Sequence, residues 1–285
     1  MLSLRINITR ACNLDCEYCY IGRTNEFLDK AFIVEQVERY RPERVTLTGG
    51  EPLLHPQVLD ILQYLIQKRI HVNMVTNGTL LNRFGDRLGE LAVQSESRGI
   101  SFSLGISYDG NSKTAIGLLG NLTRLGIKRL KLYIYPFWKD EHELRRLLEI
   151  AAKERVAVQL LYPVPLGSQQ GYTDYDQWNE YVHQFAAESS RLELEAYYQP
   201  NWAELCDIDS VLGSLTDNVS IDSDGLAYEC CLLTGLENHL RLELNEKCQW
   251  RNNGGCLAIT KNQGCDWRLE GHAASAICPV VICRV

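Results

Sequence analysis

Two hydrophobic periods alternate along the first part of the chain, and together they predict repeated strand–helix units. Short apolar runs predict six strands, at 4–9, 44–48, 71–76, 100–107, 128–135 and 156–162. Stretches with apolar residues every three or four positions predict helices at 28–40, 57–68, 80–97, 111–125 and 140–153. The strand starts recur at intervals of 40, 27, 29, 28 and 28 residues, the spacing of βα units. We therefore expect an α/β fold, a parallel sheet or partial (β/α)6 barrel.

The pattern changes after the sixth strand. Residues 162–174 contain two prolines and two glycines, which are typical of a connector, and 174–190 predict one more amphipathic helix. From about residue 200 the periodicity fades, and Gly, Asn, Asp and Cys dominate. Such a segment has too few apolar residues to form a core and needs metal to hold it together. We expect a barrel over 1–165, a bridging helical segment over 166–198 and a small irregular cysteine-rich domain over 199–285.

Charge and hydropathy narrow the classes of partner. The net charge is −7 and no stretch is rich in Lys or Arg, which argues against a nucleic-acid partner. No apolar run approaches the roughly 20 residues of a membrane span, so no membrane partner is expected. The first residues are polar and charged where a signal peptide is apolar, which predicts a cytoplasmic protein.

The cysteines carry the first chemical signal. Of 11 cysteines, three lie at Cys12, Cys16 and Cys19, none lies between 20 and 205, and eight follow from Cys206. Because a cytoplasmic chain keeps its thiols reduced, this number indicates metal. Three thiolates on one tight loop hold three irons of a cubane cluster and leave the fourth iron open to an external ligand. The alternative is a zinc knuckle closed by a distant cysteine.

The string C-N-L-D-C-E-Y-C-Y resembles the C-x3-C-x2-C signature of the radical S-adenosylmethionine (SAM) superfamily. The resemblance implies a 4Fe-4S cluster on Cys12, Cys16 and Cys19, with the amino and carboxylate groups of SAM on the open iron. It also implies that Tyr18 packs near the adenine of SAM. Read alone, Tyr18 is an ordinary packing aromatic.

Three short motifs at the ends of predicted strands strengthen the resemblance. The first motif, at 49–52, is similar to the family's G-G-E-P and implies that backbone carbonyls and Glu51 receive the SAM amino group. The second, at 76–78, corresponds to a family position that lines the ribose and methionine of SAM. The third, at 107–110, resembles the S-x-D-G of peptide-modifying members. Barrel enzymes place their active sites at these strand ends. Each motif alone is an ordinary turn. The cofactor-binding residues that they imply are Thr48, Gly49, Gly50, Glu51, Pro52, Thr76, Asn77, Ser107 and Asp109.

The C-terminal cysteines resemble the SPASM extension, which carries auxiliary 4Fe-4S clusters in one branch of the superfamily. Residues 222–231, D-S-D-G-L-A-Y-E-C-C, match its first hairpin, and 254–256 match its G-G-C turn. The family run C-x2-C-x5-C-x3-C is absent, so the pairing of thiols with one or two auxiliary clusters stays open. The single-cluster "twitch" variant and a zinc-stabilised tail are the alternatives. The expected ligands are Cys206, Cys230, Cys248, Cys256, Cys265, Cys278 and Cys283.

Cys231 directly follows the expected ligand Cys230, so we expect its side chain to point away from that cluster. A free thiol near a radical site is a good hydrogen-atom donor, and an epimerisation needs such a donor to quench the substrate radical. Cys231 is therefore the candidate catalytic residue. The alternative is a small buried apolar residue in the hairpin.

The resemblance implies reductive cleavage of SAM to a 5′-deoxyadenosyl radical that abstracts a substrate hydrogen. The implied reductant is of the flavodoxin or ferredoxin type. The first substrate hypothesis is a ribosomally made precursor peptide that receives a thioether or carbon–carbon crosslink or an epimerised residue. Because the first strand starts at residue 4, a peptide substrate is expected to need a separate peptide-recognition protein or to dock directly on the barrel mouth. The alternatives are oxidation of a small molecule, and an iron–sulfur electron carrier or sensor.

Overall fold

The structure is a computed structural model that describes most of the first two thirds of the chain and short segments beyond them. The described residues are 2–16, 19, 21–108, 122–124, 126–136, 141–161, 175–198, 218–223, 225, 227–228 and 283–284. The first seven strands are β1 (Ser3–Thr9), β2 (Arg44–Gly49), β3 (His71–Thr76), β4 (Phe102–Tyr108), β5 (Arg129–Ile134), β6 (Ala157–Leu160) and β7 (Ala196–Tyr198). The helices are α1 (Lys30–Tyr40), α2 (Val58–Gln67), α3 (Leu81–Ser97), α5 (Glu141–Lys153) and α6 (Tyr175–Arg191).

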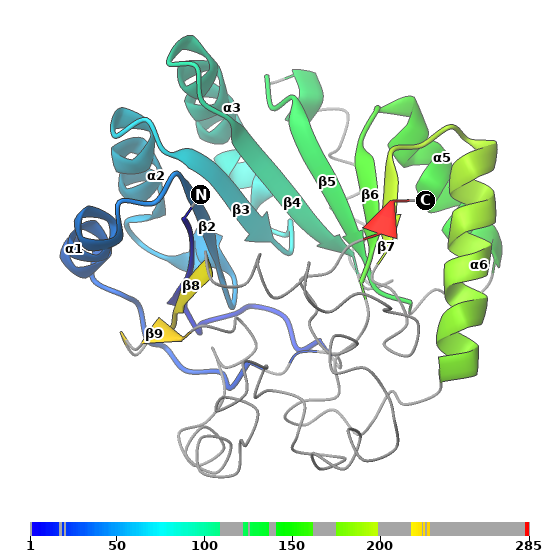
Figure 1. Ribbon diagram of the computed structural model, residues 1–285, viewed down its shortest axis with the longest axis horizontal. Helices are drawn as coiled ribbons and strands as arrows, with labels where there is room; N and C mark the ends of the chain where they lie inside the picture. The colour runs from blue at the N-terminus through cyan, green and yellow to red at the C-terminus, as the bar shows by residue number, and fades with distance from the viewer. Residues whose placement is uncertain are drawn as a thin grey trace.

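The expected alternation of strand and helix is confirmed. Strands β1 to β7 are parallel to their neighbours and follow one another in chain order across the sheet. They trace an arc with the helices on its outer side, as in a partial TIM barrel (Figure 1). Of the helix expected at 111–125, residues 122–124 are described, and they are helical.

Three short strands from the C-terminal part of the chain extend the sheet at both edges. Strand β8 (Asn218–Ile221) runs parallel to β1, and β9 (Ala227–Tyr228) pairs with it as an antiparallel hairpin. At the other edge β10 (Cys283–Arg284) pairs antiparallel with β7. Figure 1 shows β8 and β9 beside β1, far from α6. The expected hairpin is therefore present, and its first strand belongs to the barrel sheet. The domain boundaries at 165 and 198 stay predictions.

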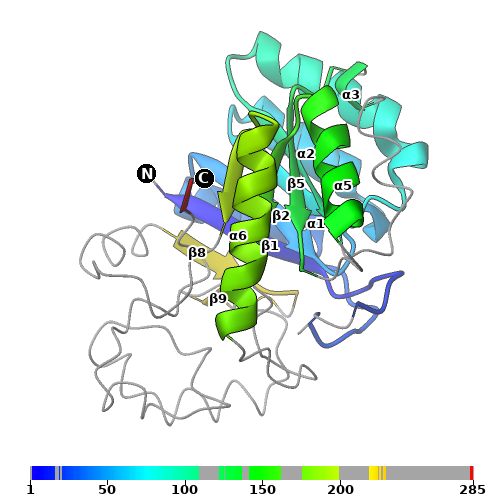
Figure 2. The same cartoon turned by 90° about the vertical axis from the view of Figure 1, so that its right-hand side faces the viewer.

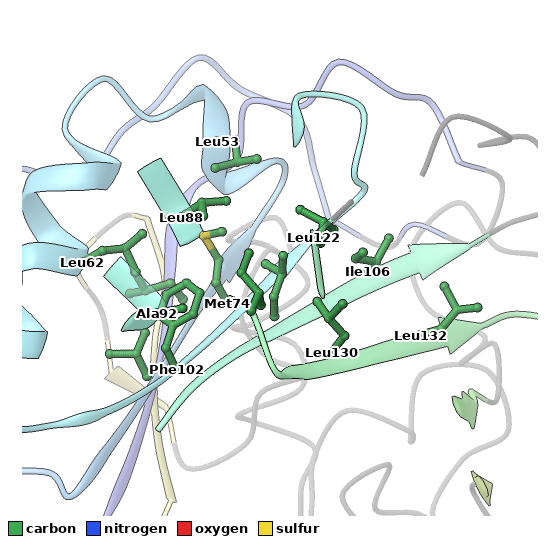
Figure 3. Close-up of a cluster of buried hydrophobic side chains, with 14 of the residues drawn as sticks. Leu53, Leu62, Met74, Leu88, Ala92, Phe102, Ile106, Leu122, Leu130 and Leu132 are labelled. Carbon is green, nitrogen blue, oxygen red and sulfur yellow. The ribbon is translucent and has the colours of Figure 1, made fainter. Parts of the chain in front are cut away.

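The core lies between the sheet and the helices. One face of each strand is apolar, and strand side chains such as Met74, Phe102 and Ile106 are buried. Figure 3 shows them in one buried cluster with Leu62 and Leu88 from the covering helices. Removing this apolar surface from water is the main stabilising contribution of the barrel.

The opposite, inner face of the sheet is polar. Side chains alternate between the faces of a strand, so the residues between the core positions point away from the helices. On β5 the core residues Leu130, Leu132 and Ile134 alternate with Lys131 and Tyr133. A closed TIM barrel fills its interior with branched apolar residues. This partial barrel presents polar groups there instead. The described inward-facing positions include Arg5, Asn7, Thr46, Asn73, Ser103, Lys131, Tyr133, Gln159 and Tyr197.

The helices cover the outer side of the sheet, as in βα units. Figure 2 shows α5 and α6 on the side of the molecule that faces the viewer. Helix α1 begins where the Asp29 side chain accepts a hydrogen bond from the Ala31 N–H at 2.8 Å, and it ends at Arg41 with a left-handed φ of 46°. Within the described residues, no helix is long and apolar enough to cross a membrane.

Candidate SAM and cluster site

The cysteine loop begins directly after β1. Cys12, Cys16 and Cys19 form no disulfide and are partly exposed, and the Cys19 N–H donates to the Cys16 carbonyl at 3.0 Å. Burial raises the pKa of the Cys19 thiol; the backbone N–H of Ile21 opposes this, and the nearby Cys12 raises the pKa further. Because metal binds the thiolate, iron that binds Cys19 must displace its proton.

The ends of the loop are tied together at its base. The Thr9 hydroxyl donates to the Glu26 carbonyl at 2.6 Å, and the Arg10 N–H donates to the same oxygen at 3.3 Å. The Leu28 N–H donates to the Ile8 carbonyl at 2.9 Å. These bonds hold the segment that carries the three cysteines as one closed loop at the carboxyl end of β1.

The glycine pair after β2 packs against the start of this loop. The Gly50 N–H donates to the Thr9 carbonyl, and the Glu51 N–H donates to the Ala11 carbonyl, each at 2.8 Å. A Cβ on Gly49 would lie 2.1 Å from the Thr9 oxygen, and one on Gly50 would lie 2.2 Å from the Ala11 oxygen. Gly49 also has a φ of +132°, which side chains rarely adopt. The glycines therefore serve the contact between the loop and β2, in addition to any approach of a ligand.

The Glu51 carboxylate is fully buried, with 0% exposure. One oxygen, Oε1, accepts from the Leu53 N–H at 2.9 Å and from the Thr76 hydroxyl at 2.8 Å. The other, Oε2, accepts from the Asn77 N–H at 2.8 Å. Burial raises the pKa of this carboxyl, and the three donors lower it. Glu51 thus joins the end of β2 to the end of β3, while Gly49 and Gly50 remain partly exposed.

Asn77 continues the network from β3 to the cysteine loop. Its side-chain nitrogen Nδ2 donates to the Asn13 Oδ1 at 2.9 Å and to the Cys12 sulfur at 3.8 Å. The Asn13 amide in turn donates to the Thr79 hydroxyl at 2.8 Å. Donors that face a thiolate stabilise its charge, so Asn77 suits a position beside a cluster ligand.

The remaining expected site residues divide into two groups. Thr48 is buried near the end of β2, Pro52 opens the short 3-10 turn η1 (Pro52–Leu54), and Ser107 lies near the end of β4 on the inner face. Cys283 lies in β10, where only the backbone is described. Outside the described residues lie Tyr18, Asp109, Cys206, Cys230, Cys231, Cys248, Cys256, Cys265 and Cys278.

The three thiols fit an iron–sulfur cluster. In the part of the chain that the structure describes, no three His, Cys, Asp or Glu side chains converge on a point where one metal ion binds. A 4Fe-4S cluster makes a different demand, because each thiolate binds its own iron and the sulfurs stay apart. Tyr135 marks the inner side of this site: burial raises the pKa of its hydroxyl, and Cys19 raises it further.

The polar inner face is the feature that sequence reasoning missed. Lys131 lies with its Nζ 4.4 Å from the centre of the Tyr197 ring and 3.5 Å from the Gln159 Oε1. Burial lowers the pKa of this ammonium, and Glu195 opposes the shift. The Tyr133 ring crosses Gly105 of β4, where a Cβ would meet it at 2.2 Å. The alternation of Lys131 and Tyr133 with leucines in 129–134 is visible in the sequence and predicts a polar inner face.

His55 is buried and lies at the end of the short helix η1. Its Nδ1 accepts from the Gln57 N–H at 3.1 Å and its Nε2 donates to the Leu28 carbonyl at 2.8 Å, which fits only the neutral ring. Burial lowers the pKa of this imidazole.

We therefore predict that acid destabilises the protein through His55. A group with a lowered folded pKa contributes its stability above its unfolded pKa, about 6.5, and loses that contribution as the pH falls below this value. Urea unfolding midpoints measured from about pH 8 to about pH 5 should fall across this window. The same series on His55→Gln should be flatter there. A variant with an unchanged slope would contradict the assignment.

The comparisons with known proteins agree with this site. The family model described as the Radical SAM superfamily matches residues 6–106, which run from β1 to β4. The GTP 3′,8-cyclase of Clostridium perfringens (strain SM101 / Type A) is 28% identical over 186 residues, covering 58% of this chain and 56% of its own length. The AdoMet-dependent heme synthase of Methanosarcina barkeri is 26% identical over 221 residues, covering 68% and 61%. The chain thus spans little more than half of the first of these relatives.

Solved structures resemble the chain over nearly its whole length. SuiB of Streptococcus suis bound to S-adenosylmethionine has a TM-score of 0.67 at 14% identity, covering 97% of this chain and 76% of SuiB. SuiB bound to precursor peptide SuiA has a TM-score of 0.65 at 14% identity. At this identity the likeness concerns the fold. The segment that matches the Radical SAM superfamily, residues 6–106, includes the cysteine loop after β1.

Proposed function

We propose that the protein is a radical SAM enzyme whose cluster is held by Cys12, Cys16 and Cys19. The observation that carries this proposal is the closed loop with three reduced cysteines beside the Gly49-Gly50 turn and Asn77. When bound, the reduced cluster supplies one electron to SAM, which splits into methionine and a 5′-deoxyadenosyl radical that takes a hydrogen atom from the substrate.

The chain's own residues have the tasks of binding and orientation. The partly exposed Gly49 and Gly50 offer backbone carbonyls to the SAM ammonium, and Glu51 fixes their turn from below. We propose that Asn77 and Thr76 bind the methionine and ribose of SAM. The same proposal assigns Ser107 and Asp109 to the SAM site and Tyr18 to the adenine. A flavodoxin- or ferredoxin-type protein supplies the electron. We further propose that Cys206, Cys230, Cys248, Cys256, Cys265, Cys278 and Cys283 hold one or two auxiliary clusters.

This proposal is tested by electron paramagnetic resonance (EPR) of the reduced, reconstituted protein. Addition of SAM should change the signal of the cluster, because the amino and carboxylate groups of SAM take the open iron. A signal that stays the same at saturating SAM would contradict the assignment of the site and would favour an iron–sulfur electron carrier.

For the substrate we propose a ribosomally made peptide. The likeness to SuiB extends over 97% of this chain, while the curated cyclase corresponds to 58% of it, so the fold comparison covers the C-terminal part as well. A separate peptide-recognition protein is part of this proposal, and Cys231 is its hydrogen-atom donor if the product is an epimer. The second candidate is a nucleotide such as GTP, favoured by the names of the curated relatives.

The two substrate classes separate in one comparison. Co-expression with a short peptide encoded beside the gene should give a mass change in that peptide, which supports the first candidate. Incubation of the reduced enzyme with SAM and GTP should leave GTP intact. Conversion of GTP without any change in the peptide would replace the first candidate by the second.

Lys131 is expected to contact the substrate, because it is a half-buried cation on the polar inner face of the sheet. Lys131→Met removes the charge and keeps most of the stem. Loss of a charge-assisted hydrogen bond of about 1.5–3 kcal/mol should raise the KM for the substrate by about 10- to 100-fold. SAM binding should not change.

Lys68→Met is the matched control. Lys68 also lies over an aromatic ring, that of Tyr64 at 5.7 Å, but at the end of α2 on the outer side of the barrel. It should leave the KM unchanged. Equal effects of the two variants would remove Lys131 from the substrate site.

A further inference from the structure

A buried ion pair connects the C-terminal part of the chain to the cysteine loop. The Arg10 guanidinium donates to the Asp222 Oδ2, and the two residues are 212 positions apart. Asp222 is 0% exposed and Arg10 is 8% exposed. Because β8 runs parallel to β1, with Ile221 opposite Ile6, Asp222 arrives beside the end of β1 where the loop begins.

Asp222 is held rigidly on its own side of this contact. Its Oδ1 accepts from the Ser223 N–H at 2.8 Å and from the Asn7 amide at 3.4 Å, and its carbonyl accepts from the Gly225 N–H at 2.8 Å. Burying two charges is costly unless the pair is well hydrogen-bonded. These bonds hold the Asp222 carboxylate in place, so its ion pair fixes the position of the Arg10 guanidinium.

Arg10 is also part of the loop itself. Its N–H donates to the Glu26 carbonyl at 3.3 Å, which closes the base of the loop, and Cys12 follows two residues later. The next residue, Ala11, accepts from the Glu51 N–H at 2.8 Å. The position of the Arg10 side chain therefore affects the position of the backbone that carries Cys12. It also affects the contact between this backbone and the Gly49–Glu51 turn.

We propose that Asp222 is a positioning residue: through Arg10, it holds the base of the cysteine loop in the place that the SAM-binding cluster requires. The proposal rests on the proposed function, and it deepens it by giving the C-terminal hairpin a role in the first site. Replacing one partner leaves the other charge buried and uncompensated, and a small displacement of a reacting centre costs up to about a hundredfold in rate.

The test compares Asp222→Asn with the wild type in two measurements. In the reconstituted, reduced protein without SAM, iodoacetamide should alkylate Cys12, Cys16 and Cys19 about tenfold faster, equivalent to about 1.4 kcal/mol of lost local stability. In the reconstituted protein, the SAM concentration that gives the half-maximal EPR change should rise. A general loss of folding would not confine faster alkylation to these three cysteines.

Glu188→Gln is the matched control, because Glu188 accepts from Arg145 at 2.7 Å and joins α6 to α5 at the other end of the sheet (Figure 1). It should leave both measurements at wild-type values. If Asp222→Asn does not fold, Arg10→Gln with Asp222→Asn removes both charges together. This pair should reproduce the faster alkylation, because glutamine is shorter than arginine and cannot span the same distance.

Wild-type alkylation rates in the folded Asp222 variant, or in the double variant, would overturn the proposal. A wild-type protein whose EPR signal ignores SAM would instead overturn the proposed function. In that case the alkylation rates of the reconstituted protein still decide whether Asp222 positions the loop.

Discussion

Replacing Cys12, Cys16 and Cys19 together by alanine is expected to abolish SAM cleavage and leave iron bound elsewhere in the chain. The three thiols are the only expected cysteine ligands before residue 206, and they share one loop after β1. Without them the first cluster has no ligands, whereas the eight later cysteines are unchanged. If all three proposed sites hold cubanes, anaerobic reconstitution should fall from about twelve irons to about eight.

Asp15→Asn controls for disturbance of the loop. Asp15 lies between the cysteines and pairs with Arg23 at the surface, where its side chain is 92% exposed. Exposed pairs contribute little to stability, so this variant should keep its iron and its activity. Loss of every cluster in the triple variant would show that the two cysteine regions are not independent.

The second large effect is expected from Gly50→Ala. The new Cβ would lie 2.2 Å from the Ala11 oxygen and 2.8 Å from the Arg10 oxygen, and both are backbone atoms. The chain must therefore separate the end of β2 from the start of the cysteine loop. We expect a loss of at least about 3 kcal/mol in the free energy of unfolding, the upper part of the range for overpacking, together with a loss of SAM binding.

Gly99→Ala provides the comparison for Gly50→Ala, because a Cβ on Gly99 meets nothing within 4 Å. Its φ of +73° still strains an alanine, by about 1–2 kcal/mol. Urea unfolding and SAM titration followed by EPR measure both variants. Gly50→Ala with the stability of Gly99→Ala and normal SAM binding would contradict the close packing described for the glycine pair.

The barrel could be predicted from the sequence because its strands and helices are locally determined. The expected strand at 71–76 is β3 to the residue, and the expected helix at 140–153 is α5 within one residue. Apolar runs and amphipathic periods report directly on burial, and burial is what forms these elements. These patterns report which residues form the core and say nothing of the function of the polar residues between them. The polar inner face with Lys131 is therefore not among the expectations from the sequence.

The contacts at the site were less predictable, because they depend on tertiary approach. The G-G-E-P motif was assigned to the ligand, yet the glycines approach Thr9 and Ala11, and the Glu51 side chain bonds to Leu53, Thr76 and Asn77. No local pattern relates Asp222 to Arg10, since the contact arises only when β8 joins the sheet beside β1. Asp222 opens the string D-S-D-G, whose residue types are common in turns, so its sequence context predicts only a turn.

The production of 5′-deoxyadenosine tests the central claim most directly. The reconstituted wild-type protein is incubated anaerobically with SAM and dithionite, and the products are separated and identified by mass. The account predicts 5′-deoxyadenosine and methionine, and neither from the Cys12, Cys16 and Cys19 triple variant. A wild-type protein that holds its iron and forms no 5′-deoxyadenosine with any reductant would contradict it.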